Sequence, residues 1–344
     1  MLFSQITGHN KIKDILMRAA EADRVGHAYI FEGPEGVGKL DMAKAFAMTL
    51  LCSDAKEGCA CGKCKDCSMF LSGNHPDVRI VTNQLYDSSK KSTDILVDTV
   101  RSMKREIYIK PYMAERKVYI VPKADTMNMF AQNSLLKVLE EPPQYCTIIL
   151  VAENSNSFLP TILSRAPILN FFPLKVNEIF EYLKKCCPDI SDKILQMSAN
   201  MSGGSRTRAI SLAESDEANE IRDKAVECIA NLSGSRRKSI YDMTLFLKQN
   251  KDDSAFIINV MQEFFKDLMF VKCGAADRIT NLDKKEQLDM LASEITDKTP
   301  QRLLEILFKY NDYISKNISY AQIAQCISLE LWEAINDRGY RSKI

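Results

Sequence analysis

The sequence predicts an α/β fold in its first half, a parallel sheet with helices on both faces, followed by domains made of helices alone. Short apolar runs alternate with helical patterns up to about residue 175, which is typical of a parallel sheet. After residue 176 the strand-like runs stop, and apolar residues recur at helical spacing. With 344 residues, 46% of them hydrophobic, two or three domains can each have a core.

Five strands are predicted in the first domain, residues 1–175. Each is a short apolar run that ends near polar or glycine residues. Because parallel strands end at the same edge of a sheet, these residues would form a ligand-binding edge. The predicted strands are residues 28–33, 78–82, 117–121, 146–152 and 168–172.

Two helical domains are predicted after the sheet. Residues 176–213 contain three short helical patterns, typical of a small lid domain. Residues 214–344 are charged and poor in glycine, with apolar residues at helical spacing, as in residues 256–270. An all-helical third domain is therefore expected.

The overall charge excludes a strong attraction of the whole chain to nucleic acid. Lys and Arg number 46 against 45 Asp and Glu, a net charge of +1, so a DNA contact would need a local patch. A basic run could face DNA, but a solvated charged surface is the default interpretation. That run consists of Arg101, Lys104, Arg105, Lys110, Arg116 and Lys117. No membrane-spanning stretch or signal-peptide pattern is evident, so a cytoplasmic protein without membrane contact is expected.

The cysteines predict a metal site. Five of the eleven fall between Cys52 and Cys67. Cys52, Cys61, Cys64 and Cys67 have the short spacings that suit a tetrahedral Zn²⁺, and four sulfur ligands leave no open position for chemistry. A structural zinc module is predicted over residues 52–67. Cys59 is expected outside the ligand set because one residue separates it from Cys61. Redox-active or incidental cysteines are the alternative.

A phosphate-binding loop is predicted between the first strand and the next helix. Gly33, Gly36, Gly38 and Lys39 fit the pattern GxxxxGK, in which backbone N–H groups and a helix N-terminus hold phosphates. The next residue should carry a hydroxyl for Mg²⁺, but it is Leu40. ATP binding is therefore doubtful. The glycines can also be explained by close packing of strand and helix alone.

The end of the third predicted strand lacks the acidic pair that would orient the attacking water in such a fold. Pro122 and Lys123 occupy these positions, and a lysine there would also repel the metal ion. The two defects together predict a nucleotide-hydrolase fold that does not turn over.

Several segments together resemble the subunits of bacterial replicative clamp loaders, which are AAA+ ATPases. The similarity covers about residues 1–210. It rests on HAYIFEGPEGVGKL at 27–40, the cysteine module, NHPDV at 74–78, KVYIVPKADTM at 117–127, NSLLKVLEEPP at 133–143 and LPTILSRA at 159–166. The resemblance implies a P-loop AAA+ module with a zinc-binding insertion, a helical lid and a C-terminal collar domain that holds subunits together. The family's ATPase subunits, gamma or tau, carry GKT and an aspartate–glutamate pair where this chain has Leu40, Pro122 and Lys123.

The resemblance also assigns a role to Arg165. Ser164 and Arg165 match a loader motif whose arginine reaches ATP bound by the neighbouring subunit, an arginine finger in trans, and Ala166 replaces the motif's cysteine. A surface salt bridge is the plain alternative. The stretch 203–210 resembles the family's second-sensor helix, with Thr207 where active subunits have arginine. Arg206 and Arg208 flank it and are expected on a solvated helix face.

Three functions follow as hypotheses. The leading one is a non-catalytic loader subunit that donates Arg165, with gamma/tau and delta subunits as partners and the sliding clamp and primer-template DNA reached through the complex. The second is an active ATPase of the same fold. The third is a stand-alone zinc-stabilised DNA-binding protein, which the near-neutral charge disfavours.

Overall fold

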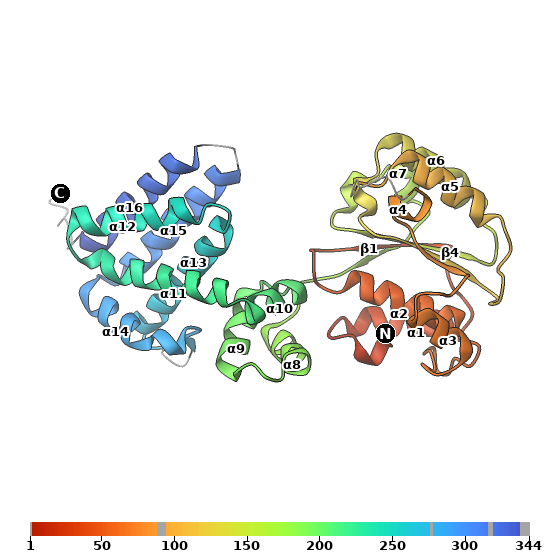
Figure 1. Ribbon diagram of the computed structural model, residues 1–344, viewed down its shortest axis with the longest axis horizontal. Coiled ribbons are helices and arrows are strands. Elements are labelled where there is room, and N and C mark those ends of the chain that lie inside the picture. Colours follow the sequence, from red (N-terminus) through yellow and green to blue (C-terminus); the bar gives the residue numbers. More distant parts are fainter. Residues whose placement is uncertain (1, 88–93, 276–277, 316–318, 338–344) are drawn as a thin grey trace. The chain divides into compact units, whose positions relative to one another are not determined.

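The computed structural model describes residues 2–87, 94–275, 278–315 and 319–337 (Figure 1). The chain divides into two compact units. The first comprises Met1–Tyr182 and Gly203–Arg208, and the second comprises Leu183–Ser202 and Ala209–Ile344. The unit boundaries do not test the three predicted domains, which stay a prediction.

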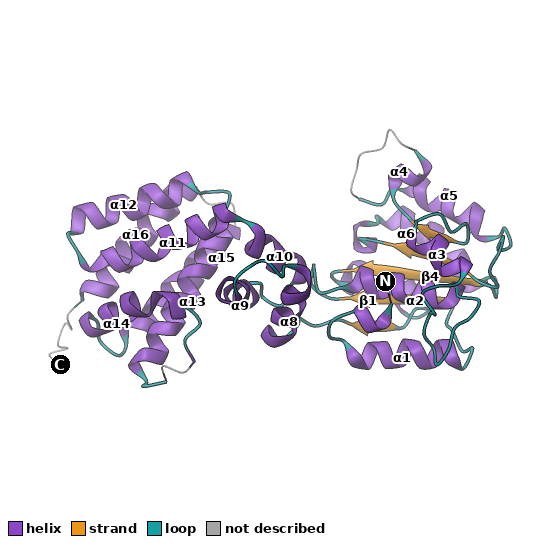
Figure 2. Ribbon diagram, turned by 60° about the horizontal axis from the view of Figure 1, so that its bottom comes forward, coloured by secondary structure: helices purple, strands orange, loops and turns teal. Residues whose placement is uncertain are grey.

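The first unit is built on a five-stranded parallel sheet, as predicted (Figure 2). The strand order is β2-β3-β4-β1-β5, with β1 and β3 on either side of β4. The segments that follow these three strands therefore meet at one edge of the sheet. The bounds are β1 Ala28–Glu32, β2 Val78–Ile80, β3 Lys117–Val121, β4 Cys146–Ala152 and β5 Ile168–Asn170.

Helices cover both faces of this sheet, because the central strands are apolar on both sides. On one face Tyr29, Phe31 and Ile149 pack against α1 and α2. On the other face Ile30 and Tyr119 pack against α5 and α6. Figure 1 shows α1–α3 on one side of the strands and α4–α7 on the other. The bounds are α1 Asn10–Glu21, α2 Lys39–Leu51, α3 Lys65–Leu71, α4 Asn83–Tyr86, α5 Val97–Ile107, α6 Met129–Glu140 and α7 Pro160–Leu163.

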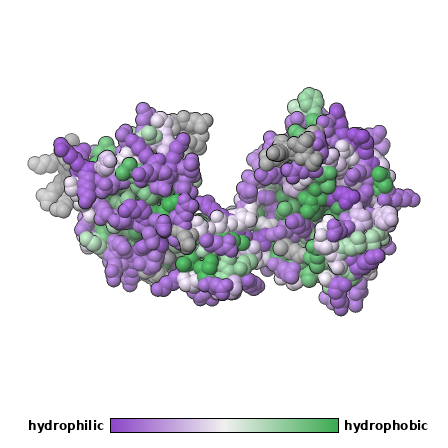
Figure 3. Space-filling model, viewed as in Figure 1, coloured by the Kyte–Doolittle hydropathy of each residue, from purple (hydrophilic) through white to green (hydrophobic). Residues whose placement is uncertain are grey.

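The rest of the chain is helical, as predicted from the spacing of its apolar residues. The core of the second unit includes Phe264, Phe265 and Leu268 of α13 and Leu331 of α16. The bounds are α8 Val176–Cys186, α9 Asp192–Met201, α10 Arg206–Glu214, α11 Asp216–Ala230, α12 Arg236–Gln249, α13 Ser254–Lys272, α14 Lys285–Glu294, α15 Thr299–Ser315 and α16 Tyr320–Asn336. Among the described residues, no helix combines the length and the apolar composition needed to cross a lipid bilayer. Most of the surface visible in Figure 3 is hydrophilic, with smaller hydrophobic areas.

Candidate functional sites

The glycine-rich loop connects β1 to α2 at the carboxyl edge of the sheet. Gly38 immediately precedes α2 and has a positive φ of 104°. A Cβ atom at Gly33 would collide with the carbonyl oxygen of Phe171, a backbone atom, whereas one at Gly38 would meet Nη2 of Arg206, the end of a side chain. Packing therefore requires glycine at position 33, and the positive φ favours glycine at position 38.

Lys39 is turned back onto its own loop. Its Nζ donates hydrogen bonds to the carbonyl oxygens of Gly33 and, at 2.6 Å, of Pro34. The residue is buried. Burial lowers the pKa of its ammonium group, while Glu153, Asp125 and Glu35 act in the opposite direction. Lys39, which would bind phosphate in an active loop, thus donates its hydrogen bonds to carbonyl groups of its own loop.

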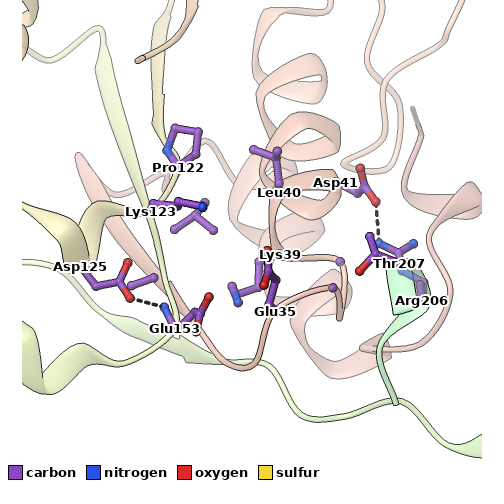
Figure 4. Close-up of a pocket in the computed structure, with 14 residues that line it drawn as sticks. Glu35, Lys39, Leu40, Asp41, Pro122, Lys123, Asp125, Glu153, Arg206 and Thr207 are labelled. Carbon is purple, nitrogen blue, oxygen red and sulfur yellow. Dashed lines mark hydrogen bonds and ion pairs between the residues drawn. The ribbon is translucent and has the colours of Figure 1, made fainter. Parts of the chain in front are cut away.

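A cavity of about 360 Å³ lies beside this loop (Figure 4). Leu40, Pro122 and Lys123 line it, so the three substituted positions predicted from the sequence face one space. They converge because β1 and β3 flank β4. The remaining lining residues are Glu35, Gly36, Gly38, Lys39, Asp41, Asp125, Val151, Ala152, Glu153, Arg206 and Thr207.

Two carboxylates of this cavity were missed by the sequence analysis. Asp125 follows β3, and Glu153 follows β4. Oδ2 of Asp125 accepts a hydrogen bond from the backbone N–H of Glu153 at 3.0 Å. The lining thus carries Glu35, Asp41, Asp125 and Glu153 against the cations Lys39, Lys123 and Arg206. This balance gives no excess positive charge for a polyphosphate.

The expectation that Arg206 lies on a solvated helix face is wrong. The residue is 4% exposed, and its Nη2 lies 2.5 Å from Oδ2 of Asp41 on α2 (Figure 4). Its backbone N–H donates to the carbonyl of Gly36 at 2.9 Å, and its guanidinium lies over the ring of Tyr182 at 5.1 Å. The ion pair with Asp41, which lies three residues after Gly38, partly compensates the charge of the buried guanidinium. Arg208 is half-buried.

The four predicted zinc ligands come together. The sulfur atoms of Cys52, Cys61, Cys64 and Cys67 all lie within 4.8 Å of one another. The Cys52–Cys64 and Cys61–Cys67 separations are 3.8 and 4.0 Å. A tetrahedral ion with Zn–S bonds of ~2.3 Å requires sulfur–sulfur edges of about 3.8 Å. The cluster does not include Cys59, whose backbone pairs with that of Lys56.

Backbone N–H groups donate to three of the four sulfur atoms. Cys61 N–H donates to the sulfur of Cys52, Cys64 N–H to that of Cys61, and Cys67 N–H to that of Cys64, at 3.3 to 3.4 Å. Although burial raises the pKa of Cys64, hydrogen bonds from Cys67 and Ser53 bring it down to about 6. Burial raises the pKa of Cys52 and Cys67 in the protein without metal, so a Zn²⁺ ion would have to displace the protons of these two thiols on binding.

The NHPDV segment has a structural role that its sequence did not reveal. Asp77 is buried, and its carboxylate accepts hydrogen bonds from the backbone N–H groups of Tyr112, Met113 and Ala114 at 2.6 to 2.9 Å. Nδ1 of His75 accepts from the N–H of Asp77, and Nε2 lies 3.7 Å from Asp66. The segment therefore holds the connection that leads into β3.

Arg165 follows the short helix α7 and lies at the surface. Its Nη1 donates to the carbonyl of Thr161 at 2.9 Å, and its Nη2 forms an ion pair with Glu140 at 3.1 Å. The side chain is 34% exposed. It belongs to the α7 side of the sheet and does not line the glycine-loop cavity.

Part of the basic run is used within the fold. Lys117 is buried and donates to the carbonyl of Glu106 at 3.0 Å. Arg116 pairs with Asp23 at 2.6 Å, and Arg101 lies 3.6 Å from Asp98. These contacts weaken the case for a DNA-binding patch made of the whole run.

The chain is similar to proteins of bacterial DNA polymerase III. The family model described as "DNA polymerase III, delta subunit" matches residues 8–175. The delta' subunit of Bacillus subtilis (strain 168) is 27% identical over 328 residues, covering 94% of this chain and 96% of that protein. The delta' subunit of Pseudomonas aeruginosa is 34% identical over 180 residues, covering 52% and 53%. The tau subunit of B. subtilis is 26% identical over 336 residues, covering 92% of this chain but only 57% of that protein.

Proposed function

On the basis of these similarities, we propose that the chain is a clamp-loader subunit of DNA polymerase III and that it is the delta prime-like, non-catalytic subunit of the loader. In this role it supports the complex and supplies Arg165 in trans to ATP bound by a neighbouring gamma/tau subunit. The delta subunit completes the complex, and the sliding clamp and primer-template DNA are reached through it.

The observation that carries the non-catalytic role is the lining of the glycine-loop cavity. Leu40 offers no hydroxyl to Mg²⁺, and Pro122 and Lys123 offer no carboxylate at the end of β3. Lys39 is bonded to loop carbonyls, and Arg206 to Asp41. The side chains expected to meet phosphate or metal are thus replaced at positions 40, 122 and 123, and the cations Lys39 and Arg206 are already paired.

The cysteine cluster fits a structural Zn²⁺. Its sulfur–sulfur separations of 3.8 and 4.0 Å match a tetrahedral site. Cys52 directly follows α2, Cys64 directly precedes α3, and Cys67 lies in the first turn of α3. A bound ion would therefore fix the 52–67 insertion to the helix that follows the glycine loop, with no part in any reaction.

Arg165 fits a finger because a guanidinium offers planar, permanently charged donors to phosphate. The test is reconstitution of the loader from its subunits, followed by measurement of DNA-stimulated ATP hydrolysis. We expect Arg165→Ala to lower the rate on the order of 10³-fold if the finger acts on a rate-limiting site, with zinc content and assembly unchanged. Arg165→Lys should restore little.

Arg18→Ala is the matched control, because Arg18 is an exposed arginine on α1, on the opposite face of the sheet. It should leave hydrolysis unchanged. Unaltered hydrolysis and clamp loading by the Arg165→Ala complex would contradict the finger and leave a supporting role only.

The active-ATPase alternative keeps one observation in its favour, since Asp125 and Glu153 bring carboxylates to the cavity that Lys39 lines. Hydrolysis by the isolated chain separates the two functions. Salt-dependent DNA binding without partners would instead favour the stand-alone DNA-binding protein.

A further inference from the structure

Arg165 is held from two sides by residues of its own chain. Nη1 donates to the carbonyl of Thr161 at 2.9 Å and lies 3.2 Å from Oγ of Ser164. Nη2 reaches Glu140, the last residue of α6, at 3.1 Å. Glu140 is the charged partner in this arrangement, since the contacts from Thr161 and Ser164 are neutral.

The backbones that carry this pair are fixed by the core. Gln132 of α6 donates to the carbonyls of Met127 and Ser157 and accepts from the N–H of Leu159, directly before α7. Ile162 and Ala166, on either side of the arginine, are buried. Because α6 and α7 are tied together in this way, Glu140 and Arg165 face each other from rigid supports.

The pair itself is solvated and therefore a weak source of stability. The side chains of Arg165 and Glu140 are 34% and 49% exposed, and ion pairs exposed to this extent contribute little to stability. A phosphate carries more charge than one carboxylate and can displace it. The contact does restrict the direction of a long side chain that would otherwise populate many rotamers.

We propose that Glu140 is a positioning residue for Arg165: it holds the guanidinium between the ends of α6 and α7 until a neighbouring subunit's phosphate takes the place of the carboxylate. This inference rests on the proposed finger role. Preorganisation of this kind affects the reaction step more than the binding of ATP, because Glu140 itself touches no nucleotide.

The test uses the reconstituted loader with Glu140→Gln, Glu140→Asp and Glu140→Gln combined with Arg165→Ala. Glu140→Gln should lower kcat of the DNA-stimulated ATPase about 2- to 5-fold, the rate equivalent of a solvated ion pair. The KM for ATP and complex assembly should stay unchanged. Glu140→Asp, which keeps the charge, should retain most of the rate. Added to Arg165→Ala, Glu140→Gln should cause no further loss.

The matched control is Glu141→Gln, an exposed carboxylate directly after α6, which should leave kcat unaltered. If Arg165→Ala lowers the rate while Glu140→Gln does not, or raises it, the positioning role is overturned and the finger stands. If Arg165→Ala has no effect, the finger fails. If Glu140→Gln lowers kcat by the same factor in the wild-type chain and in the Arg165→Ala variant, its effect does not act through Arg165, and the positioning role is overturned.

Discussion

At the scale of single residues, charged groups near the glycine loop are paired within the chain. Arg206 is 4% exposed at its side chain, whereas its partner Asp41 is 31% exposed. Nε and Nη1 of Arg206 have no hydrogen-bond partner among the residues that the structure describes. Loss of the carboxylate would therefore leave a buried charge uncompensated, but loss of the guanidinium would leave a carboxylate that water can reach.

This asymmetry predicts the effects of two variants. Asp41→Ala should lower the free energy of unfolding of the first unit by about 3 kcal/mol, the cost of breaking a buried pair from one side. Arg206→Met should lower this free energy of unfolding by less than Asp41→Ala does. Hydrogen exchange in α2 under increasing urea measures both, and an equal or reversed order would contradict the burial argument. The single tryptophan, Trp332, lies in the second unit and would not report on the change.

The cysteine cluster gives a second prediction at this scale. The chain purified without chelator should contain stoichiometric zinc, and Cys64→Ser should lose it, because a hydroxyl is a poor replacement for a thiolate ligand. Cys59→Ser is the control, since its sulfur lies outside the cluster. Metal analysis decides the outcome. Zinc retained in Cys64→Ser, or lost in Cys59→Ser, would show that the ligand set is wrong.

At the scale of elements, Asp77 connects the start of β2 to the turn before β3. Its carboxylate satisfies three backbone N–H groups that have no partner in a helix or strand. Asp77→Ala should destabilise this turn by about 1–3 kcal/mol, because three backbone donors would lose their acceptor. Hydrogen exchange at Tyr112, Met113 and Ala114 measures the change. Unaltered protection would mean that other groups hold the turn.

The same contact predicts sensitivity to acid. Although burial raises the pKa of Asp77, hydrogen bonds from Tyr112, Ala114 and Met113 hold it below its ordinary value. A carboxyl with a lowered pKa contributes stability above the unfolded-state pKa of about 4, and this is lost as the pH falls through the folded-state value. Protection of the turn should therefore decline below about pH 4. In Asp77→Asn the protection should be weaker and should lack this part of the pH dependence.

At the scale of the whole molecule, we predict that the isolated chain hydrolyses ATP no faster than background. Leu40→Thr alone should not restore turnover, because Pro122 and Lys123 would still supply no carboxylate. A steady-state assay with Lys39→Ala as control checks this. Turnover that disappears in Lys39→Ala would show an active enzyme and favour the ATPase alternative.

Much of the architecture could be predicted from the sequence. All five predicted strands end within two residues of the observed strands. The three central strands, β1, β3 and β4, are continuously apolar because they are buried on both faces. The helical character after residue 176 followed from the apolar spacing. The cysteine cluster could be predicted because its spacing is local.

What the sequence could not show were contacts between distant segments. Arg206 meets Asp41 across 165 positions, and Glu153 meets Asp125 across 28. A charged residue beside a glycine pair is typical of a solvated surface, and only the fold reveals that it packs on the glycine loop. The role of Glu140 was hidden for the same reason, since its partner lies on another helix.

The glycine loop has one consequence for how such chains are recognised. A side chain at Gly33 would collide with the backbone of Phe171, and the positive φ of Gly38 is one that side chains rarely adopt, so selection for folding alone would keep these glycines even where nothing binds. A nucleotide-binding signature can thus persist in a lineage after its ligand has been lost. Substitution libraries screened only for folded protein would find the loop as intolerant as that of a working enzyme, and motif searches would continue to count such chains among the ATPases.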